Sequence, residues 1–244
     1  MEEIELAIRI QSLSYRYRKQ QVCSLSDVSF SIKSGDRVAL LGSNGAGKTT
    51  LIHCITGVLP IQDNQIFIFN KDLKIDTKKR ISNLGFVPQD YSLYSELTVM
   101  QNLFFFGAWY GLTSEKIEIK SKLLLQQLEL ETYVDKPVKY LSGGIKRRIN
   151  LAIGLLHDPT ILILDEPTVG IDVQSRNNIL KMLMVLNKSG TTLLYSSHQL
   201  SEAEELCNRV VFLNNGKVVA CDSIFNLLRD YETNSLEALF SKLS

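Results

Sequence analysis

The stretch that decides the fold of this chain reads Gly42, Ser43, Asn44, Gly45, Ala46, Gly47, Lys48, Thr49 and Thr50. It fits the pattern G-x-x-x-x-G-K-[ST], and it follows a strand-like apolar run (37–41) and precedes a helix-like run (51–56). In such a loop, glycines let successive backbone N–H groups converge on phosphate oxygens, and the following helix directs its positive N-terminus at them. Lys48 can reach the β- and γ-phosphates, and the Thr49 hydroxyl can bind Mg²⁺. The stretch therefore predicts a nucleoside triphosphate site.

Length and composition are typical of one large domain. The chain has 244 residues, and 27 Lys plus Arg against 26 Asp plus Glu give a net charge of +1. So balanced a charge offers no electrostatic argument for nucleic acid, and we expect no nucleic acid partner. Four scattered cysteines without a C-x-x-C pair suit a reducing compartment. The acidic start predicts no secretory signal, and no apolar run approaches the ~20 residues of a membrane-spanning helix.

Two stretches near the N-terminus alternate apolar and polar residues, which is typical of half-buried strands. They run from Ile4 to Ile10 and from Val28 to Ile32, and a Ser-Gly-Asp turn (34–36) leads into the phosphate-loop strand. The two strands predict an antiparallel sheet beside a main parallel one. Between them stands Tyr17, which either stacks on a nucleotide base or is an ordinary tyrosine at a strand end. The residues alone leave both interpretations open.

The rest of the chain alternates between strand-like and helix-like segments. Strands are predicted at 66–69, 83–88, 161–164, 191–196, 210–213 and 217–220, with a turn at 70–72 and an Asn-Gly hairpin at 214–216. Residues 90–157 predict a mostly helical insertion, and further helices are expected at 174–187, 201–207 and in the tail 223–243. The continuous apolar run Ile161–Leu164 is fit for a central parallel strand that is buried on both faces. This order predicts an α/β core with a helical insertion.

Two carboxylates come directly after the predicted central strand. In open α/β sheets, ligands bind at the carboxyl ends of the strands, and the phosphate loop follows such an end too. We therefore expect Asp165 and Glu166 to face the triphosphate. Asp165 would hold Mg²⁺ through water. Glu166 would orient and deprotonate the attacking water, a general-base role worth about 10²–10⁴-fold in rate.

Two further polar residues end predicted strands. His198 follows the strand at 191–196, and this position is the only reason to prefer it to His53 or His157. A lone histidine is more usually structural. Gln89 ends the strand at 83–88, where its amide can contact Mg²⁺ or the attacking water, and a capping role is an equal alternative.

A second phosphate-binding pattern reads Leu141, Ser142, Gly143 and Gly144. Two glycines before a helix expose backbone N–H groups, the serine adds a hydroxyl donor, and the helix adds its positive N-terminus. The chain has one triphosphate loop, and the second pattern belongs to the helical insertion. This arrangement suggests that the pattern serves a phosphate held by another copy.

Together the motifs closely resemble those of the nucleotide-binding subunit of an ABC transporter, over essentially the whole chain. They are, in order, Gly42–Thr49, Gln89, Leu141–Gly144, Ile161–Glu166, Asp172 and His198. The resemblance implies an α/β fold: a P-loop NTPase (RecA-like) core, an N-terminal antiparallel β subdomain and a mostly helical, signature-bearing subdomain. It implies one domain over 1–244, in which 1–89 and 158–244 form the core with the β subdomain and 90–157 the helical subdomain.

The resemblance also implies roles for single residues. Tyr17 falls where the family has its base-stacking aromatic, so the ATP-binding set is Tyr17 with residues 42–50. The catalytic set is Lys48, Glu166 and His198, the last contacting the γ-phosphate. The Mg²⁺ set is Thr49, Gln89 and Asp165, and Gln89 also links the metal to the membrane partner. The signature Leu141–Gly144 and Asp172 would touch the ATP and the body of the other protomer.

The partners are implied in the same way. Two copies, or this chain and a paralogous ATPase, would sandwich two ATP molecules with Mg²⁺. Segments 94–99, 105–107, 141–148 and 235–240 look like exporter ATPases of the drug- or lipid-efflux type. These imply a separate transmembrane permease and a peripheral location on the cytoplasmic face of the cell membrane. The cargo is not readable, because in this architecture the membrane subunit holds it.

Several positions depart from the family pattern without removing a group that contacts phosphate or water. Ile145 stands where many members have glutamine, and Val173 replaces a common proline. Asn64 and Asn70 stand where glycine is usual, and asparagine tolerates left-handed backbone geometry. We therefore expect the site to be catalytically active and not degenerate.

Two alternatives belong to other functional classes. One is a soluble ABC-type ATPase of translation, DNA repair or iron–sulfur assembly, although the chain has no second cassette, long coiled coil or cysteine pair. The other is a regulatory nucleotide-binding module, against which the intact Asp165-Glu166 pair argues.

Overall fold

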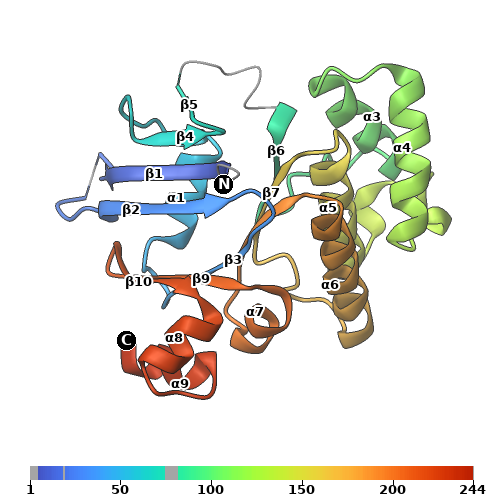
Figure 1. Ribbon diagram of the computed structural model, residues 1–244. Coiled ribbons are helices and arrows are strands. Elements are labelled where there is room, and N and C mark those ends of the chain that lie inside the picture. Colours follow the sequence, from blue (N-terminus) through green and yellow to red (C-terminus); the bar gives the residue numbers. More distant parts are fainter. Residues whose placement is uncertain (1–4, 19, 75–81, 244) are drawn as a thin grey trace.

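Two sheets and a set of helices make up the structure, a computed structural model that describes residues 5–18, 20–74 and 82–243 (Figure 1). The strands are β1 (Leu6–Tyr15), β2 (Leu25–Lys33), β3 (Arg37–Leu41), β4 (Ile66–Ile68), β5 (Lys71–Asp72), β6 (Leu84–Val87), β7 (Ile161–Asp165), β8 (Thr192–Ser196), β9 (Arg209–Asn214) and β10 (Lys217–Ser223). The larger sheet has the order β10-β9-β3-β8-β7-β6, parallel except for β10. The smaller sheet, β2-β1-β4-β5, is antiparallel, as expected.

The helices lie in the chain between the strands of the larger sheet and after its last strand. They are α1 (Lys48–Ile55), α3 (Val99–Trp109), α4 (Ser114–Gln127), α5 (Gly143–Leu155), α6 (Val173–Lys188), α7 (Leu200–Leu206), α8 (Ile224–Asp230) and α9 (Leu236–Leu243), with short 3-10 turns at Glu131–Tyr133 and Val138–Tyr140. Helices α3, α4 and α5 lie between β6 and β7 in the chain and gather on one side of the larger sheet (Figure 1). The helical insertion is thus present, while its limits at 90 and 157 as a subdomain stay a prediction.

Strand β3 is buried on both faces, because its side chains enter two different cores. Ala39 and Leu41 pack in a core with residues of α3, α5, α6 and α7. Val38 and Leu40 pack in a second core, which α1 shares with β1 and β2. The same alternation holds along β7, which explains why the run Ile161–Leu164 has no polar residue.

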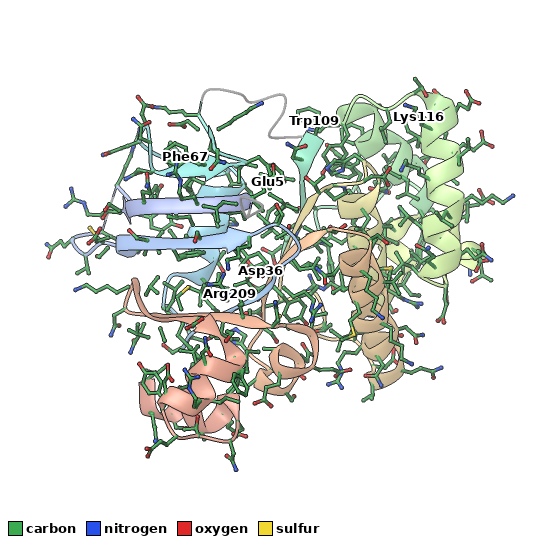
Figure 2. The ribbon with its side chains drawn as sticks, in the orientation of Figure 1. Glu5, Asp36, Phe67, Trp109, Lys116 and Arg209 are labelled. Carbon is green, nitrogen blue, oxygen red and sulfur yellow. The ribbon has the colours of Figure 1, made fainter. Side chains whose placement is uncertain are left out.

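Polar contacts fix the beginning of β3, which is the end of the strand opposite to the phosphate loop. Asp36 forms an ion pair with Arg209 of β9, with 3.0 Å between Oδ2 and Nη1 (Figure 2). The Arg37 side chain donates to the carbonyl of Leu206 and to the side chain of Asn187. These contacts therefore hold the amino-terminal end of β3 in place before the strand enters the core.

Two local expectations were wrong. Residues 71–72 form β5 and not a turn, because Lys71 and Asp72 pair with Ile68 and Phe67 and the reversal occurs at Phe69 and Asn70. Helix α1 begins at Lys48 and not at Leu51, so the end of the glycine-rich loop is already the first helical turn. The substitution of glycine by asparagine is tolerated as expected, since Asn64 and Asn70 both have φ 60°. Ile4, predicted to begin the first strand, lies outside the described residues.

Candidate active site

The phosphate loop connects β3 to α1 and needs its glycines for space as well as for backbone angle. Gly47 has φ 106°, a region that favours glycine, and a Cβ there would lie 2.7 Å from the Ser24 carbonyl oxygen. A Cβ on Gly42 would lie 2.3 Å from the Leu213 carbonyl oxygen. The loop is therefore packed against β9 on one side and the start of β2 on the other.

Lys48 is folded back onto this loop. Its Nζ donates to the carbonyl oxygens of Gly42, at 2.7 Å, and Ser43, at 3.1 Å, and the side chain is only 6% exposed. Burial lowers the pKa of Lys48, an effect that the nearby carboxylates of Glu166 and Asp165 oppose. The ammonium thus sits partly desolvated beside the place where phosphate oxygens would enter.

An open cleft of about 380 Å³ lies over the loop. The predicted site residues that line it are Tyr17, Asn44, Gly45, Ala46, Gly47, Lys48, Thr49, Thr50, Gln89, Glu166 and His198, and Gln20 and Ser24 line it as well. These residues come from five separate parts of the chain, and the fold brings them together at the carboxyl ends of the strands. Gly42, Ser43 and Asp165 lie next to the cleft in the chain without lining it.

Glu166 lines the cleft with both carboxylate oxygens engaged. Gln89 Nε2 donates to Oε2 at 3.0 Å, and His198 Nε2 contacts Oε1. The residue is 6% exposed and has φ 51°, a left-handed conformation that is uncommon outside glycine and clusters at functional sites. Its N–H donates to the Ser196 carbonyl at 3.1 Å, which holds this conformation in place.

Asp165 ends β7 and is 2% exposed. It pairs in register with Ser196 of β8, whose hydroxyl donates to Oδ1 at 2.6 Å. Thr49, Gln89 and Asp165 together offer hydroxyl, amide and carboxylate oxygens, the hard donors that Mg²⁺ prefers when it also keeps several waters. Among the described residues there is no cluster of three or more His, Cys, Asp or Glu side chains that would hold a softer or fully protein-bound metal. The donor set fits Mg²⁺.

Tyr17 borders the cleft on the side of the antiparallel sheet. Its hydroxyl lies 3.3 Å from Oγ1 of Thr50, and its ring meets the edge of Tyr15 with 5.1 Å between centroids. The ring is therefore held at the mouth of the loop, where a nucleotide base could stack on it.

The signature residues lie elsewhere. Ser142 is exposed and caps α5 by accepting a hydrogen bond from the Ile145 N–H, and Gly143 and Gly144 begin the helix. None of the three lines the cleft. Leu141 faces inward and packs in the core with the helices. Asp172 is also outside the cleft, where it caps α6 through the Ser175 N–H, a hydrogen bond that lowers its pKa.

The sequence did not reveal a link between α5 and the segment Pro88–Gln89, which contains the hydrogen-bond partner of Glu166. Arg147, 4% exposed, donates from Nη1 to the carbonyl oxygens of Pro88 at 3.1 Å and Gln89 at 2.6 Å. Asn150 also donates to the Pro88 carbonyl, at 3.1 Å. Arg147 was visible only as one of three basic residues at the start of a helix. No local sequence signal distinguishes it from Lys146, because only the packing of α5 buries it.

Comparison with known proteins agrees with this geometry. A family model described as "ABC transporter" matches residues 25–169, more than half of the chain, and includes the phosphate loop, the signature and the Asp165-Glu166 pair. The chain belongs to the ABC transporter family. Its fold class is therefore that of the P-loop NTPases, with the antiparallel and helical additions that the family carries. Like other members it is an ATPase that binds and hydrolyses ATP, with Mg²⁺ as the general metal of the family.

Two curated relatives and one solved structure illustrate the likeness. Linearmycin resistance ATP-binding protein LnrL of Bacillus subtilis is 38% identical over 87% of this chain and 68% of that protein. Nod factor export ATP-binding protein I of Sinorhizobium fredii is 36% identical over 88% of this chain and 62% of that protein. The ATP binding subunit of an ABC transporter superposes with a TM-score of 0.89 at 30% identity, over 97% of this chain and 99% of that one. The chain thus spans about two thirds of the length of these curated relatives. None of the helices in the described residues combines the length and apolarity needed to cross a membrane.

Proposed function

We propose that two copies of this chain, or this chain and a paralogous ATPase, close head to tail around two ATP molecules and drive export through a separate membrane subunit. The observation that carries the proposal is the separation of the signature from the cleft within one chain. Ser142 and Gly143 are exposed at the start of α5, yet neither lines the cleft of the phosphate loop. A phosphate bound by Ser142 would therefore belong to the other copy, and each ATP would be held between two chains.

Within each half-site, the residues of the cleft have separate roles. Lys48 exchanges the carbonyl oxygens of Gly42 and Ser43 for the β- and γ-phosphates, and Tyr17 stacks on the base. Glu166 accepts the proton of the attacking water on a carboxylate oxygen, and His198 contacts the γ-phosphate from the side of β8. Thr49, Gln89 and Asp165 would hold Mg²⁺, which neutralises phosphate charge when bound.

An exposed aromatic patch supports a membrane partner near the same site. Tyr94, Phe105 and Trp109 are 49%, 42% and 72% exposed, and the rings of Tyr94 and Phe105 meet with 4.5 Å between centroids. Trp109 is the last residue of α3 and is labelled in Figure 2. Aromatic side chains exposed together are typical of protein interfaces. The patch follows Gln89 closely in the chain, so a permease bound there would contact the segment that holds Glu166.

Export and location are supported by likeness alone. The names of two relatives concern linearmycin resistance and Nod factor export, and both are ATP-binding proteins. By analogy this chain would work on the cytoplasmic face of the cell membrane, held there by its permease.

The head-to-tail dimer can be tested with purified Glu166→Gln protein, which should bind ATP without hydrolysing it. Addition of ATP and Mg²⁺ should shift its mass in light scattering from monomer to dimer. Ser142→Arg in the same background places a bulky charge where the partner's phosphate would lie, and it should leave the protein monomeric with ATP still bound. Ser189→Arg, an exposed change at the C-terminal end of α6, is the matched control and should dimerise normally.

A dimer that forms equally well with Ser142→Arg would refute the trans role of the signature. The membrane partner requires a second experiment, in which the full-length chain is isolated from detergent extract. Copurification of a polytopic membrane protein that is lost with Trp109→Ala would support the docking patch. Reproducible isolation with soluble partners alone would overturn the transporter assignment.

A further inference from the structure

Beyond the residues assigned above, one buried carboxylate contacts both the segment that carries Glu166 and the segment that carries His198. Glu202 lies in the first turn of α7 and is 1% exposed. Burial of a charged group is costly unless hydrogen bonds replace its lost water. The hydrogen-bond partners of Glu202 therefore indicate what the buried carboxylate contributes to the structure.

Three hydroxyl groups donate to a single oxygen of Glu202. Tyr195 Oη lies 2.7 Å, Thr168 Oγ1 2.8 Å and Ser197 Oγ 3.2 Å from Oε2. Arg176 Nη1 is 3.8 Å from the other oxygen, which accepts no hydrogen bond from the described residues. Burial raises the pKa of Tyr195, with the charge of Glu202 adding to the effect, so the Tyr195 hydroxyl stays a proton donor.

The positions of these donors in the chain show which segments Glu202 connects. Thr168 is two residues after Glu166, on the turn that leads to Asp172. Ser197 directly precedes His198, and its hydroxyl also accepts from the Gln199 N–H at 2.9 Å. Tyr195, in contrast, belongs to the body of β8. One carboxylate therefore joins the segment that follows Glu166 to the segment that precedes His198.

We propose that Glu202 is a positioning residue that fixes Glu166 and His198 relative to each other, an inference that rests on the catalytic roles proposed for those two residues. The carboxylate does not line the cleft. It holds the two loops through their hydroxyls, and the Glu166 N–H bond to Ser196 closes the same arrangement from the backbone side. Displacement of catalytic groups by ~1 Å can cost 10²-fold in rate, so modest loosening of this cluster should be visible in turnover.

A merely stabilising cluster would behave differently, and the three donors allow the two roles to be separated. Thr168→Val and Ser197→Ala each remove the hydrogen bond between a catalytic loop and Glu202 and leave Glu202 with other donors. Tyr195→Phe removes a hydrogen bond to the same oxygen from the strand. Glu205→Gln changes an exposed carboxylate on the same helix and should match wild type in every measurement.

We would measure kcat, KM for ATP and the melting temperature of each full-length variant. The proposal expects Thr168→Val and Ser197→Ala to lower kcat by about 10- to 100-fold with KM changed less than about twofold, and Tyr195→Phe to lower kcat much less at a similar loss of melting temperature. Glu202→Gln should combine the kcat losses of the two loop variants. Folding of Glu202→Gln is not required, because the hydroxyl variants carry the test by themselves.

The inference is overturned if kcat follows melting temperature across all three hydroxyl variants, or if KM rises while kcat stays constant. Its failure is distinguishable from failure of the proposed catalytic roles. If Glu166→Gln and His198→Ala retain wild-type turnover, those roles are wrong. If both are inactive and the loop variants are not, only the positioning role of Glu202 is wrong.

Discussion

Gln89 donates a hydrogen bond to the carboxylate of Glu166, with 3.0 Å between Nε2 and Oε2, and its own carbonyl accepts from Arg147 at 2.6 Å. Glu166 is therefore connected through one residue to α5, the helix whose N-terminus carries the exposed Ser142 and Gly143. A movement of α5 toward a second chain would act on the carboxylate by way of Gln89.

Removing the charge of Glu166 should stop hydrolysis while leaving the nucleotide site intact. Glu166→Gln keeps the size of the side chain but cannot accept a proton, so turnover should fall by about 10²–10⁴-fold. Steady-state phosphate release would measure the loss, and a fluorescent ATP analogue would report binding, which should stay near wild type. Unchanged hydrolysis would exclude Glu166 as the general base.

Removing the ammonium of Lys48 should weaken ATP binding. Charge-assisted hydrogen bonds are worth about 1.5–3 kcal/mol, so Lys48→Ala should raise the Kd for ATP by roughly 10- to 100-fold. Titration calorimetry would measure the affinity. Lys116→Ala, an exposed lysine on α4 (Figure 2), is the control and should bind like wild type. Equal affinities for Lys48→Ala and the control would contradict the role of the loop.

Loosening the Arg147 contacts should reduce both stability and turnover. Arg147→Gln loses charge-assisted hydrogen bonds to two carbonyls, so the free energy of unfolding should fall by about 1–3 kcal/mol. Since Gln89 would then be held less firmly, kcat should also fall, with KM for ATP little changed. Lys122→Gln removes an exposed charge on α4 and serves as control. Urea denaturation and steady-state kinetics would give the two quantities, and a loss of stability with normal kcat would reject the connection to Glu166.

The buried thiol of Cys54, on α1 behind the phosphate loop, should make stability depend on alkaline pH. Burial raises the pKa of Cys54 from 9.0 to about 12, so above pH 9 the unfolded chain loses a proton that the folded chain retains. Stability from this group is thus fully present below pH 9 and is lost as the pH rises toward 12, by about 1.4 kcal/mol per unit.

The measurement is the difference in unfolding free energy between wild type and Cys54→Ala, from urea curves at pH 8 to 11. Because other titrating groups are shared, they cancel in the difference. Wild type should lose its advantage over Cys54→Ala as the pH rises. A difference that stays constant with pH would show that this thiol titrates normally in the folded protein.

Sequence reasoning succeeded where the signal is local. The phosphate loop is a continuous motif, and the strands before Asp165 and His198 are marked by apolar runs, so the edge of the sheet at which they meet followed from the topology of open α/β sheets. It failed at β5, because a strand of two residues has no periodicity. It also missed Arg147 and Glu202, since each stands in a polar segment that is indistinguishable from an exposed helix face. Only long-range packing decides that these charges are buried.

The alternation of β3 between two cores has a further consequence for the loop that follows it. With Ala39 and Leu41 packed on one side and Val38 and Leu40 on the other, the strand has no free face along which to shift. Gly42 therefore follows a strand whose position is set by apolar packing and does not depend on bound nucleotide. Arriving ATP does not have to build this support, so the free energy of its contacts is available for moving the parts that are less firmly held.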